Sequence, residues 1–428
     1  MFIKNLSLSV GKEVELKGWV YNLRSSGSIA FLQIRDGSGF VQAIVDKKSV
    51  PEAVWATAQK ITVETSVIVH GRVSAHPKHP GVFEIQVGDL KIVQLAEEFP
   101  IGKKEHGPDF LLDIRHLWLR APRQWAIQRV RNTIINATYE FFNQNDFIKI
   151  DAPILTPTSC ENTTELFGMK YFDEGNAYLT QSGQLYIESA IFSHGRVFDF
   201  GPVFRAEKSK TRRHLTEFWM MDAEMAFVEH VGNLEIQENL VSFIVNKVLE
   251  INQEELKILE RDVKPLENVK APFYRLSHEE AVKKLRKLGS DIKADDDLGG
   301  DDETTLTKEY DKPVFVEKYP AKIKAFYMKR DPQDESRALC ADLLAPEGYG
   351  EVIGGSQRED DYETLLRRLK EFGLKREPFE WYLDLRRYGS VPHSGFGYGL
   401  ERLVTWICGL QHVRESIPFP RMINRLKP

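Results

Sequence analysis

The chain has 428 residues, of which 42% are hydrophobic and 28% charged, the balance of an ordinary globular protein. This length predicts two or three domains, and no apolar run approaches the roughly 18 residues that a membrane span needs. The amino-terminal segment lacks the apolar core of a signal peptide, and the three cysteines lie far apart in the sequence. These features exclude disordered, collagen-like and membrane-spanning chains and predict a cytoplasmic protein.

The first 95 residues show the alternation of apolar and polar residues that is typical of β-strands. Five such runs, separated by glycine- and proline-rich turns, lie at residues 14–20, 29–34, 40–45, 66–73 and 82–87. Together with a helical stretch at 51–59, they predict a small closed barrel of the OB type over residues 1–98, although a generic β-domain fits the pattern equally well. The first 80 residues carry ten Lys and Arg against six Asp and Glu, which permits a local contact with nucleic acid.

A change of pattern near residue 100 predicts a second domain. Residues 99–116 are rich in Pro and Gly and are expected to be a hinge. Beyond it, a helical period indicates a long helix at 123–145, followed by a strand that ends at Asp151-Ala152-Pro153. Helices are also expected at 233–249 and 278–288, and the acidic stretch 295–303 is expected to be a loop or the edge of an insertion. We predict one large α+β domain over residues 117–428.

Three segments of this second domain carry the strongest functional signal. The first is the helix and strand that end at Pro153. The second is Phe204-Arg205-Ala206-Glu207 with the basic run that follows it up to Phe218, which predicts a hairpin. The third is the glycine-rich run 395–402, GFGYGLER, at the start of an apolar helix. In order and spacing they resemble the three signature motifs of the class II aminoacyl-tRNA synthetases, and the barrel places the resemblance in the aspartyl, asparaginyl and lysyl subgroup.

The resemblance covers nearly the whole chain and implies a fold, a partner and a reaction. The implied catalytic fold is an antiparallel sheet flanked by helices. A homodimer is implied through the first motif, which is helix 123–145 and the strand ending at Pro153. The implied reaction joins two anions, because the amino-acid carboxylate attacks the α-phosphorus of ATP. Positioning and charge neutralisation therefore do the catalytic work, and no protein nucleophile is needed.

The resemblance also implies roles for individual residues in ATP binding. Arg205 matches the arginine whose planar fork contacts both the carboxylate and the α-phosphate, and Phe218 matches the ring on which adenine stacks. Arg402 matches the arginine at the γ-phosphate, and glycines such as Gly395 let the backbone approach the nucleotide. The expected catalytic residues are Arg205, Glu207 and Arg402. The expected ATP site comprises Arg205, Glu207, Arg213, His214, Phe218, Glu351, Gly397, Gly399 and Arg402.

Asp342 and Glu351 resemble the carboxylates that hold Mg²⁺ in this subgroup. Magnesium is a hard cation that one or two carboxylates and substrate phosphates can bind, so two acids suffice. The expected cofactors are therefore ATP, as a substrate, and Mg²⁺.

The amino-acid pocket is expected to select asparagine over aspartate. Aspartyl enzymes usually have a lysine where this chain has Ile187, so the cation that would pair with a second carboxylate oxygen is missing. Glu217 would accept from the substrate NH₂ group while Arg358 donates to its C=O group. The full expected asparagine site is Glu161, Ser182, Gln184, Glu217 and Arg358.

The barrel is expected to bind the anticodon of tRNA(Asn). Arg24, Phe31 and Gln42 match three positions that contact the central uridine shared by the aspartate and asparagine anticodons. Phe31 would stack on the base, and the other two would hydrogen-bond to it. For Phe31 the alternative is a core residue of its strand.

Three other functions remain open. An aspartyl enzyme, including one that charges both tRNAs, is favoured by Asp222-Ala223-Glu224, a run that is closer to some aspartyl enzymes. An ATP-dependent amide-forming enzyme of the asparagine synthetase kind would lack the barrel. A catalytically inactive tRNA-binding module would not need Arg205, Glu351 or Arg402.

Overall fold

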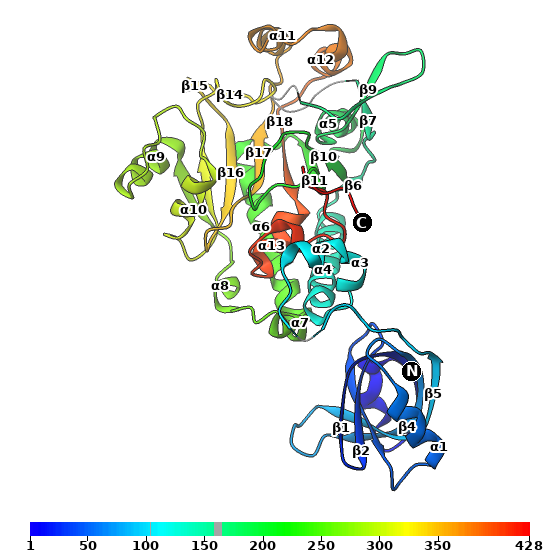
Figure 1. The fold of residues 1–428 in the computed structure, drawn as a ribbon. Helices are drawn as coiled ribbons and strands as arrows, with labels where there is room; N and C mark the ends of the chain where they lie inside the picture. The colour runs from blue at the N-terminus through cyan, green and yellow to red at the C-terminus, as the bar shows by residue number, and fades with distance from the viewer. Residues whose placement is uncertain (103, 158–164) are drawn as a thin grey trace. The chain divides into compact units, whose positions relative to one another are not determined.

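A computed structural model describes residues 1–102, 104–157 and 165–428. The chain divides into two compact units, Met1–Gly107 and Pro108–Pro428. Figure 1 follows the chain by colour, from the blue barrel of the first unit to the cyan-to-red second unit. None of the helices in the described part of the chain has the length and apolarity that a membrane span requires.

The first unit is a closed five-stranded barrel, which confirms the predicted OB-type fold. Its strands pair in the order β1-β2-β3-β5-β4, with β3 and β5 parallel and the other pairs antiparallel. Gly18 lies at a close approach of two strands, where a Cβ would collide with the carbonyl oxygen of Arg35. The elements are η1 (Ile3–Ser9), β1 (Glu13–Ser26), β2 (Ile29–Arg35), β3 (Phe40–Asp46), α1 (Glu52–Lys60), β4 (Ser66–Ala75) and β5 (Phe83–Gln94).

The second unit is built on an eight-stranded sheet in the order β12-β13-β16-β17-β18-β11-β10-β6. The six central strands are antiparallel, as the resemblance implies. The two edge pairs, β12 with β13 and β10 with β6, are parallel, so the sheet is mixed. The strands are β6 (Ile148–Lys149), β10 (Arg196–Phe204), β11 (Glu217–Ala226), β12 (Tyr274–Ser277), β13 (Val314–Glu317), β16 (Cys340–Ala345), β17 (Gly350–Gln357) and β18 (His393–Gly399).

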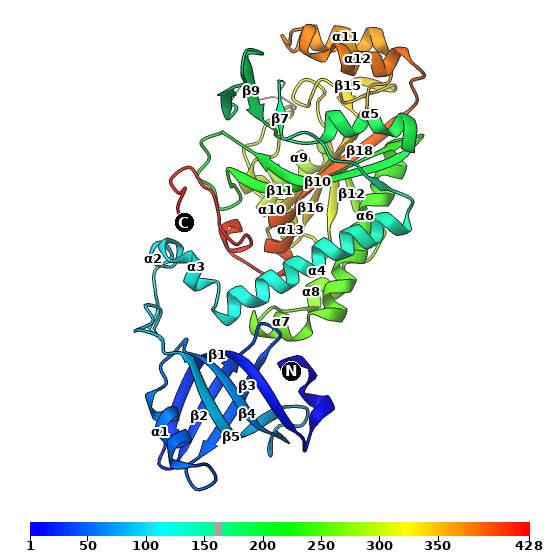
Figure 2. The ribbon, with the colours of Figure 1, turned by 90° about the vertical axis from the view of Figure 1, so that its right-hand side faces the viewer.

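One face of this sheet is covered by α4 (Pro122–Gln144) and α6 (His230–Ile251), which lie along it in Figure 2. Ile127, Val130 and Ile134 of α4 are fully buried in the same apolar core as Met221 of β11 and Phe396 of β18. The spacing of the three α4 side chains is the helical period from which the sequence predicted this helix. The opposite face of β11 carries Phe218, Asp222 and Glu224, which alternate with the core side chains.

The acidic stretch 295–303 is not wholly a loop, and the expectation made from its charge is wrong at its carboxyl end. Helix α10 (Gly300–Thr307) begins inside it, after α9 (His278–Lys287). Leu306 is the apolar anchor of α10 and packs in a cluster with Leu285 of α9. Because one buried leucine in eight residues sets no visible period, the helix could not be distinguished from a charged loop.

The carboxyl-terminal part of the predicted hinge folds with the second unit. Arg115 is buried, and its guanidinium donates to the carbonyl oxygens of Ile417 and Pro418, both at 2.8 Å. The remaining elements are α2 (Pro108–Asp113), α3 (Arg115–Trp118), β7 (Leu155–Thr156), β8 (Gly168–Lys170), β9 (Asn176–Leu179), α5 (Gln184–His194), α7 (Gln253–Ile258), α8 (Lys264–Glu267), β14 (Arg330–Asp331), β15 (Asp334–Ala338), α11 (Tyr362–Glu371), η2 (Glu377–Phe379), α12 (Glu380–Arg387), α13 (Leu400–Ile407) and η3 (Val413–Glu415).

Candidate active site

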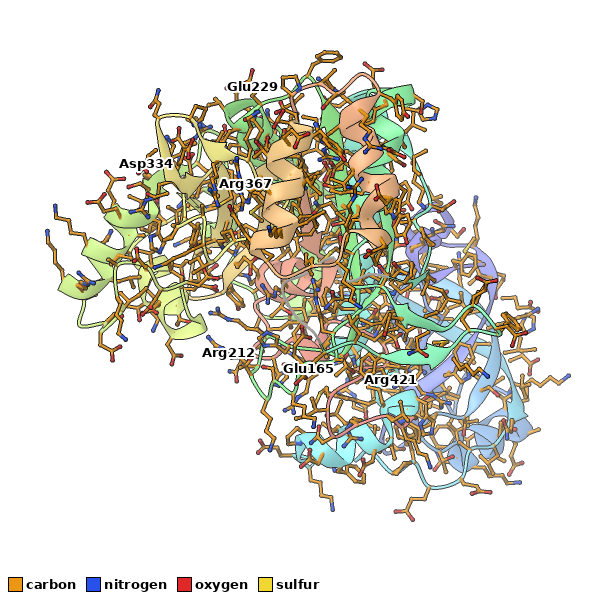
Figure 3. All side chains as sticks on the ribbon, turned by 90° about the horizontal axis from the view of Figure 1, so that it is seen from above. Glu165, Arg212, Glu229, Asp334, Arg367 and Arg421 are labelled. Carbon is orange, nitrogen blue, oxygen red and sulfur yellow. The ribbon has the colours of Figure 1, made fainter. Side chains whose placement is uncertain are left out.

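The second and third motif segments meet at a cavity of about 490 Å³ on the polar face of the sheet, whereas no residue of the first segment lines it. The loop between β10 and β11, strand β17 and the junction of β18 with α13 supply its walls. The carboxyl-terminal segment supplies Met422 and Ile423 to the lining, directly after Arg421, which Figure 3 labels. The Arg421 carbonyl accepts from the backbone N–H of Thr216 at 2.9 Å. All the residues expected to bind ATP line this cavity, namely Arg205, Glu207, Arg213, His214, Phe218, Glu351, Gly397, Gly399 and Arg402.

Strand β11 sorts its side chains between the cavity and the core by simple alternation. Phe218, Asp222 and Glu224 share one face, whereas Met221 lies on the other, in the core with the helices. On the neighbouring strand β18, a Cβ on Gly397 would lie 2.5 Å from Asp222 Oδ1. The β18 glycines therefore make room for the acidic side chains of β11, a role that we did not expect from the sequence.

Positive charge gathers at one end of the cavity. Arg205 Cζ lies 5.9 Å from the centroid of the Phe218 ring, so a planar base and an anion would each find a partner there. Arg402 Nη1 donates to Glu351 Oε2 at 2.7 Å. Burial, together with Arg402, lowers the pKa of His214, which favours a neutral imidazole. The Phe218 ring together with the guanidinium groups of Arg205 and Arg402 is suited to bind a nucleoside triphosphate.

The two carboxylates expected to hold magnesium converge over Gly354. A Cβ on this glycine would lie 3.2 Å from Glu351 Oε1 and 3.7 Å from Asp342 Oδ1. Burial, opposed by Lys324 and reinforced by Glu351, raises the pKa of Asp342 to about 6. The described residues contain no cluster of three or more metal-ligating side chains. Two convergent carboxylates nevertheless fit Mg²⁺, which takes its other ligands from phosphates and water.

A buried ion pair lies on the same sheet, on the face that carries Phe218. Arg358 donates to Glu224 through Nε at 3.2 Å and through Nη2 at 2.5 Å, and it donates to Ser356 Oγ at 2.7 Å. The two charged side chains are 3% and 0% exposed. Burial raises the pKa of Glu224 to about 7 although Arg358 opposes this rise. The pair thus offers one donor and one acceptor with no net charge.

Glu217 is not the partner of Arg358, which corrects the amino-acid site expected from the sequence. Glu217 stands seven positions before Glu224 on β11, a separation of about 23 Å along a strand. Because seven is odd, its side chain also lies on the opposite face from Phe218 and Glu224. The sequence contained the better candidate in Asp222-Ala223-Glu224, but only the pairing of β11 with β18, beside β17, brings Glu224 to Arg358.

The other predicted amino-acid residues fall into two groups. Ser182 Oγ donates to Asp222 Oδ2 at 2.9 Å and accepts from the Gln184 backbone N–H at 3.0 Å. Ser182 and Gln184 are both buried at the start of α5, beside the acidic side of β11. Glu161 lies outside the described residues.

Ile187 is fully buried in an apolar cluster with Ile191 and Val197. Its neighbour Glu188 is also fully buried and accepts from His393 Nε2 at 2.8 Å and from Tyr382 Oη at 2.7 Å, as well as from Arg386. Burial opposes ionisation of this carboxyl, but Arg386 and His393 hold its pKa at about 2. Since Ile187 lies in the apolar cluster, the contrast between lysine and isoleucine cannot by itself explain amino-acid selection.

The barrel brings its three predicted anticodon residues together. Arg24 lies 4.4 Å from the ring centroid of Phe31, and its Nη2 atom lies 3.4 Å from Gln42 Oε1. Gln42 in turn donates to Glu84 at 2.7 Å. Phe31 is only half-buried, whereas its neighbours Ala30 and Leu32 lie in the core, so the alternation turns Phe31 outward. The cluster has the aromatic and hydrogen-bonding groups that a splayed base requires.

Comparison with known proteins agrees with this geometry. The family described as tRNA synthetases class II (D, K and N) matches residues 107–423, and an OB-fold nucleic acid binding domain matches residues 14–93. An asparagine–tRNA ligase from Pelotomaculum thermopropionicum is 54% identical over 100% of this chain and 99% of its own length. The asparaginyl-tRNA synthetase of Pyrococcus horikoshii, solved with asparaginyl-adenylate, superposes with a TM-score of 0.96 at 47% identity, covering 100% of this chain and 99% of that one. The corresponding Entamoeba histolytica enzyme is 31% identical, with a TM-score of 0.88 over 98% and 97% of the two chains. The chain therefore belongs to the class II tRNA synthetases, within the family of asparagine–tRNA ligases.

Proposed function

We propose that this protein activates asparagine with ATP and transfers the asparaginyl group to the 3′ adenosine of tRNA(Asn). In the first step a bond forms between an asparagine carboxylate oxygen and the α-phosphorus of ATP, and the bond to the leaving pyrophosphate breaks. In the second step the tRNA hydroxyl takes the asparaginyl group, and AMP leaves. Both steps are group transfers that need positioning and charge neutralisation.

The buried pair of Glu224 and Arg358 is the observation that carries the choice of asparagine. A carboxamide has one donor group and one acceptor group, and the pair supplies the complementary acceptor and donor. Aspartate would add a negative charge beside Glu224, whereas Arg358 is already paired with Glu224 and the nearby Arg386 with Glu188. Burying an uncompensated charge costs several kcal/mol, so aspartate should be strongly rejected.

The cationic end of the cavity would bind the triphosphate. Arg205 contacts the carboxylate and the α-phosphate together, and its charge stabilises the transition state as negative charge moves toward the leaving group. Adenine stacks on Phe218, and Arg402 and Arg213 balance the outer phosphates. His214 shares a hydrogen bond with the Thr211 hydroxyl through Nδ1 on the same loop. Glu207 lines the cavity beside Arg205.

Asp342 and Glu351 would hold Mg²⁺. When bound, the ion would neutralise phosphate charge. The support for this assignment is the convergence of both carboxylates over Gly354 and the rise in the pKa of Asp342 that their proximity helps to cause. Glu351 also accepts a hydrogen bond from Arg402 at 2.7 Å. The same carboxylate would therefore bind Mg²⁺ and orient the arginine that contacts the outer phosphates.

A homodimer would form through the first motif. Strand β6 is an edge of the eight-stranded sheet, and edge strands expose unpaired backbone groups. Ile148, Ile154 and Leu155, on or next to this edge, are 48%, 43% and 41% exposed. These apolar side chains support a second copy as the partner. Replacing Ile148 by Asp should shift the mass measured by light scattering from dimer to monomer.

Charging of two transcripts with two amino acids tests the proposed function. The purified protein should attach asparagine to tRNA(Asn) and should attach neither asparagine nor aspartate to tRNA(Asp). Attachment of aspartate to both transcripts would instead support the aspartyl alternative. Formation of a free amide product without aminoacylation of either tRNA would support an amide-forming enzyme. The OB-fold barrel argues against this alternative, because such an enzyme would lack it.

A further inference from the structure

Helix α10 contacts the ATP cavity through a charged side chain that no sequence motif identified. Glu303 Oε2 accepts from Arg213 Nη1 at 2.6 Å and from the backbone N–H of Glu351 at 3.0 Å. The side chains of Glu303 and Arg213 are 14% and 15% exposed, so this ion pair is largely shielded from solvent. A charged pair with little solvent around it is stronger than a surface pair.

The Nη2 end of the Arg213 guanidinium is held by the same region. Its Nη2 atom donates to Thr304 Oγ1 at 2.6 Å and to the Gly348 carbonyl at 2.9 Å. Gly350 has a φ of +75°, and a Cβ there would collide with both Glu303 and Arg213. The turn between β16 and β17 is thus shaped to let α10 reach the loop between β10 and β11.

The contacts leave Arg213 able to bind a ligand. A guanidinium has five N–H donors, of which the described contacts use three, so two remain. Arg213 also lines the cavity with Arg205 and Arg402. Arginine side chains lose conformational entropy when they are fixed, and a held arginine has already lost much of it before the ligand arrives.

We propose that Glu303 is a positioning residue that fixes the Arg213 guanidinium at the cationic end of the cavity, with Thr304 as its second support. This inference rests on the proposed ATP binding by the cavity. The alternative is that Glu303 withholds Arg213 from the phosphates and must release it. The two alternatives predict opposite changes in ATP affinity when the carboxylate is removed.

Four variants test the proposal: Glu303→Ala, Glu303→Gln, Thr304→Val and Arg213→Ala. Glu303→Ala should raise the KM for ATP about tenfold, a typical effect of removing the partner of a charged hydrogen-bonding group, and leave the KM for asparagine unchanged. Glu303→Gln keeps an acceptor and should recover part of the loss. Thr304→Val, which does not touch Glu351, should raise the KM for ATP by a smaller factor. Asp301→Asn is the matched control, because Asp301 is an exposed acid on the same helix.

The double variant distinguishes a role through Arg213 from one through Glu351. If Glu303 acts through Arg213, adding Glu303→Ala to Arg213→Ala should change the KM for ATP little further. Additive effects, or tighter ATP binding by Glu303→Ala in a direct calorimetric titration, would overturn the proposal. Wild-type protein without asparagine-dependent pyrophosphate exchange would instead refute the proposed function, so the two failures are distinguishable. Thermal melting of each variant verifies that it is folded.

Discussion

At the scale of single residues, the proposed function makes amino-acid choice depend on the charge balance of one buried carboxylate and one buried guanidinium. Glu224 and Arg358 are neutral as a pair, with Glu188, Arg386 and His393 in a second buried network nearby. Neutral asparagine leaves this balance intact, whereas aspartate disturbs it.

The variant Glu224→Gln tests this balance. Loss of the negative charge leaves Arg358 uncompensated, so activation of asparagine should fall at least about tenfold while the relative rejection of aspartate becomes weaker. The measurement is kcat/KM for pyrophosphate exchange with each amino acid. Glu217→Gln is the control, because its side chain lies on the other face of β11, and its preference for asparagine should equal that of the wild type. An unchanged preference in Glu224→Gln would refute the role of Glu224.

Wild-type selectivity should also depend on pH. Burial raises the pKa of Glu224 to about 7, so lowering the pH from about 8 to about 6 protonates it and removes the charge that repels aspartate. The ratio of asparagine to aspartate activation should therefore decrease as the pH falls. The Glu224→Gln variant is the reference, because it lacks this carboxyl, and its ratio should vary less with pH. A ratio that is constant in the wild type contradicts the prediction.

Arg205 is the residue on which chemistry at the α-phosphate should depend most. Arg205→Ala removes a charge-assisted contact that strengthens in the transition state, and the exchange rate should fall by roughly 10²–10³. Lys208→Ala, a matched removal of positive charge from the same loop, should have a much smaller effect. An exchange rate within about threefold of wild type in Arg205→Ala would show that the assignment is wrong.

At the scale of elements, period and alternation predicted most of the structure. The long helix α4, the hairpin of β10 and β11, and the five barrel strands agree with their sequence patterns within a few residues, except that β1 and β5 extend further. Helix α10 was missed because its buried residues are one leucine and one threonine at its carboxyl end, behind a run of acidic residues. The parallel edges of the sheet were missed because strand direction depends on connections that no local pattern records.

The prediction for the barrel concerns Phe31, whose side chain lies on the outward face of β2. Phe31→Ala should remove base stacking worth roughly 1–3 kcal/mol, so aminoacylation efficiency should fall while adenylate formation without tRNA stays normal. Both activities are measured on the same preparation. A parallel loss of both would mean that Phe31 supports the fold of the barrel instead. Leu32→Ala is the reference for such a structural effect, because Leu32 is a buried core residue of the same strand.

At the scale of the whole molecule, motif order identified the family and the residues that line the cavity, but it did not identify the buried pair of Glu224 and Arg358. Most of the residues proposed to bind ATP lie within or next to the motifs in sequence, so short patterns include them. Glu224 and Arg358 come from strands 134 positions apart and meet only through the sheet. Glu217 was predicted in place of Glu224, although the alternation of side chains along β11 places these two acids on opposite faces of the sheet.

The central claim is that this protein selects asparagine, and amino-acid-dependent exchange of pyrophosphate into ATP tests it most directly. Wild-type protein is assayed with asparagine and with aspartate, each freed of the other, over a range of concentrations. Activation of asparagine should exceed that of aspartate by at least about 10³-fold in kcat/KM, the scale expected when a buried group would be left unpaired. Comparable exchange with aspartate would contradict the claim and favour an aspartyl enzyme.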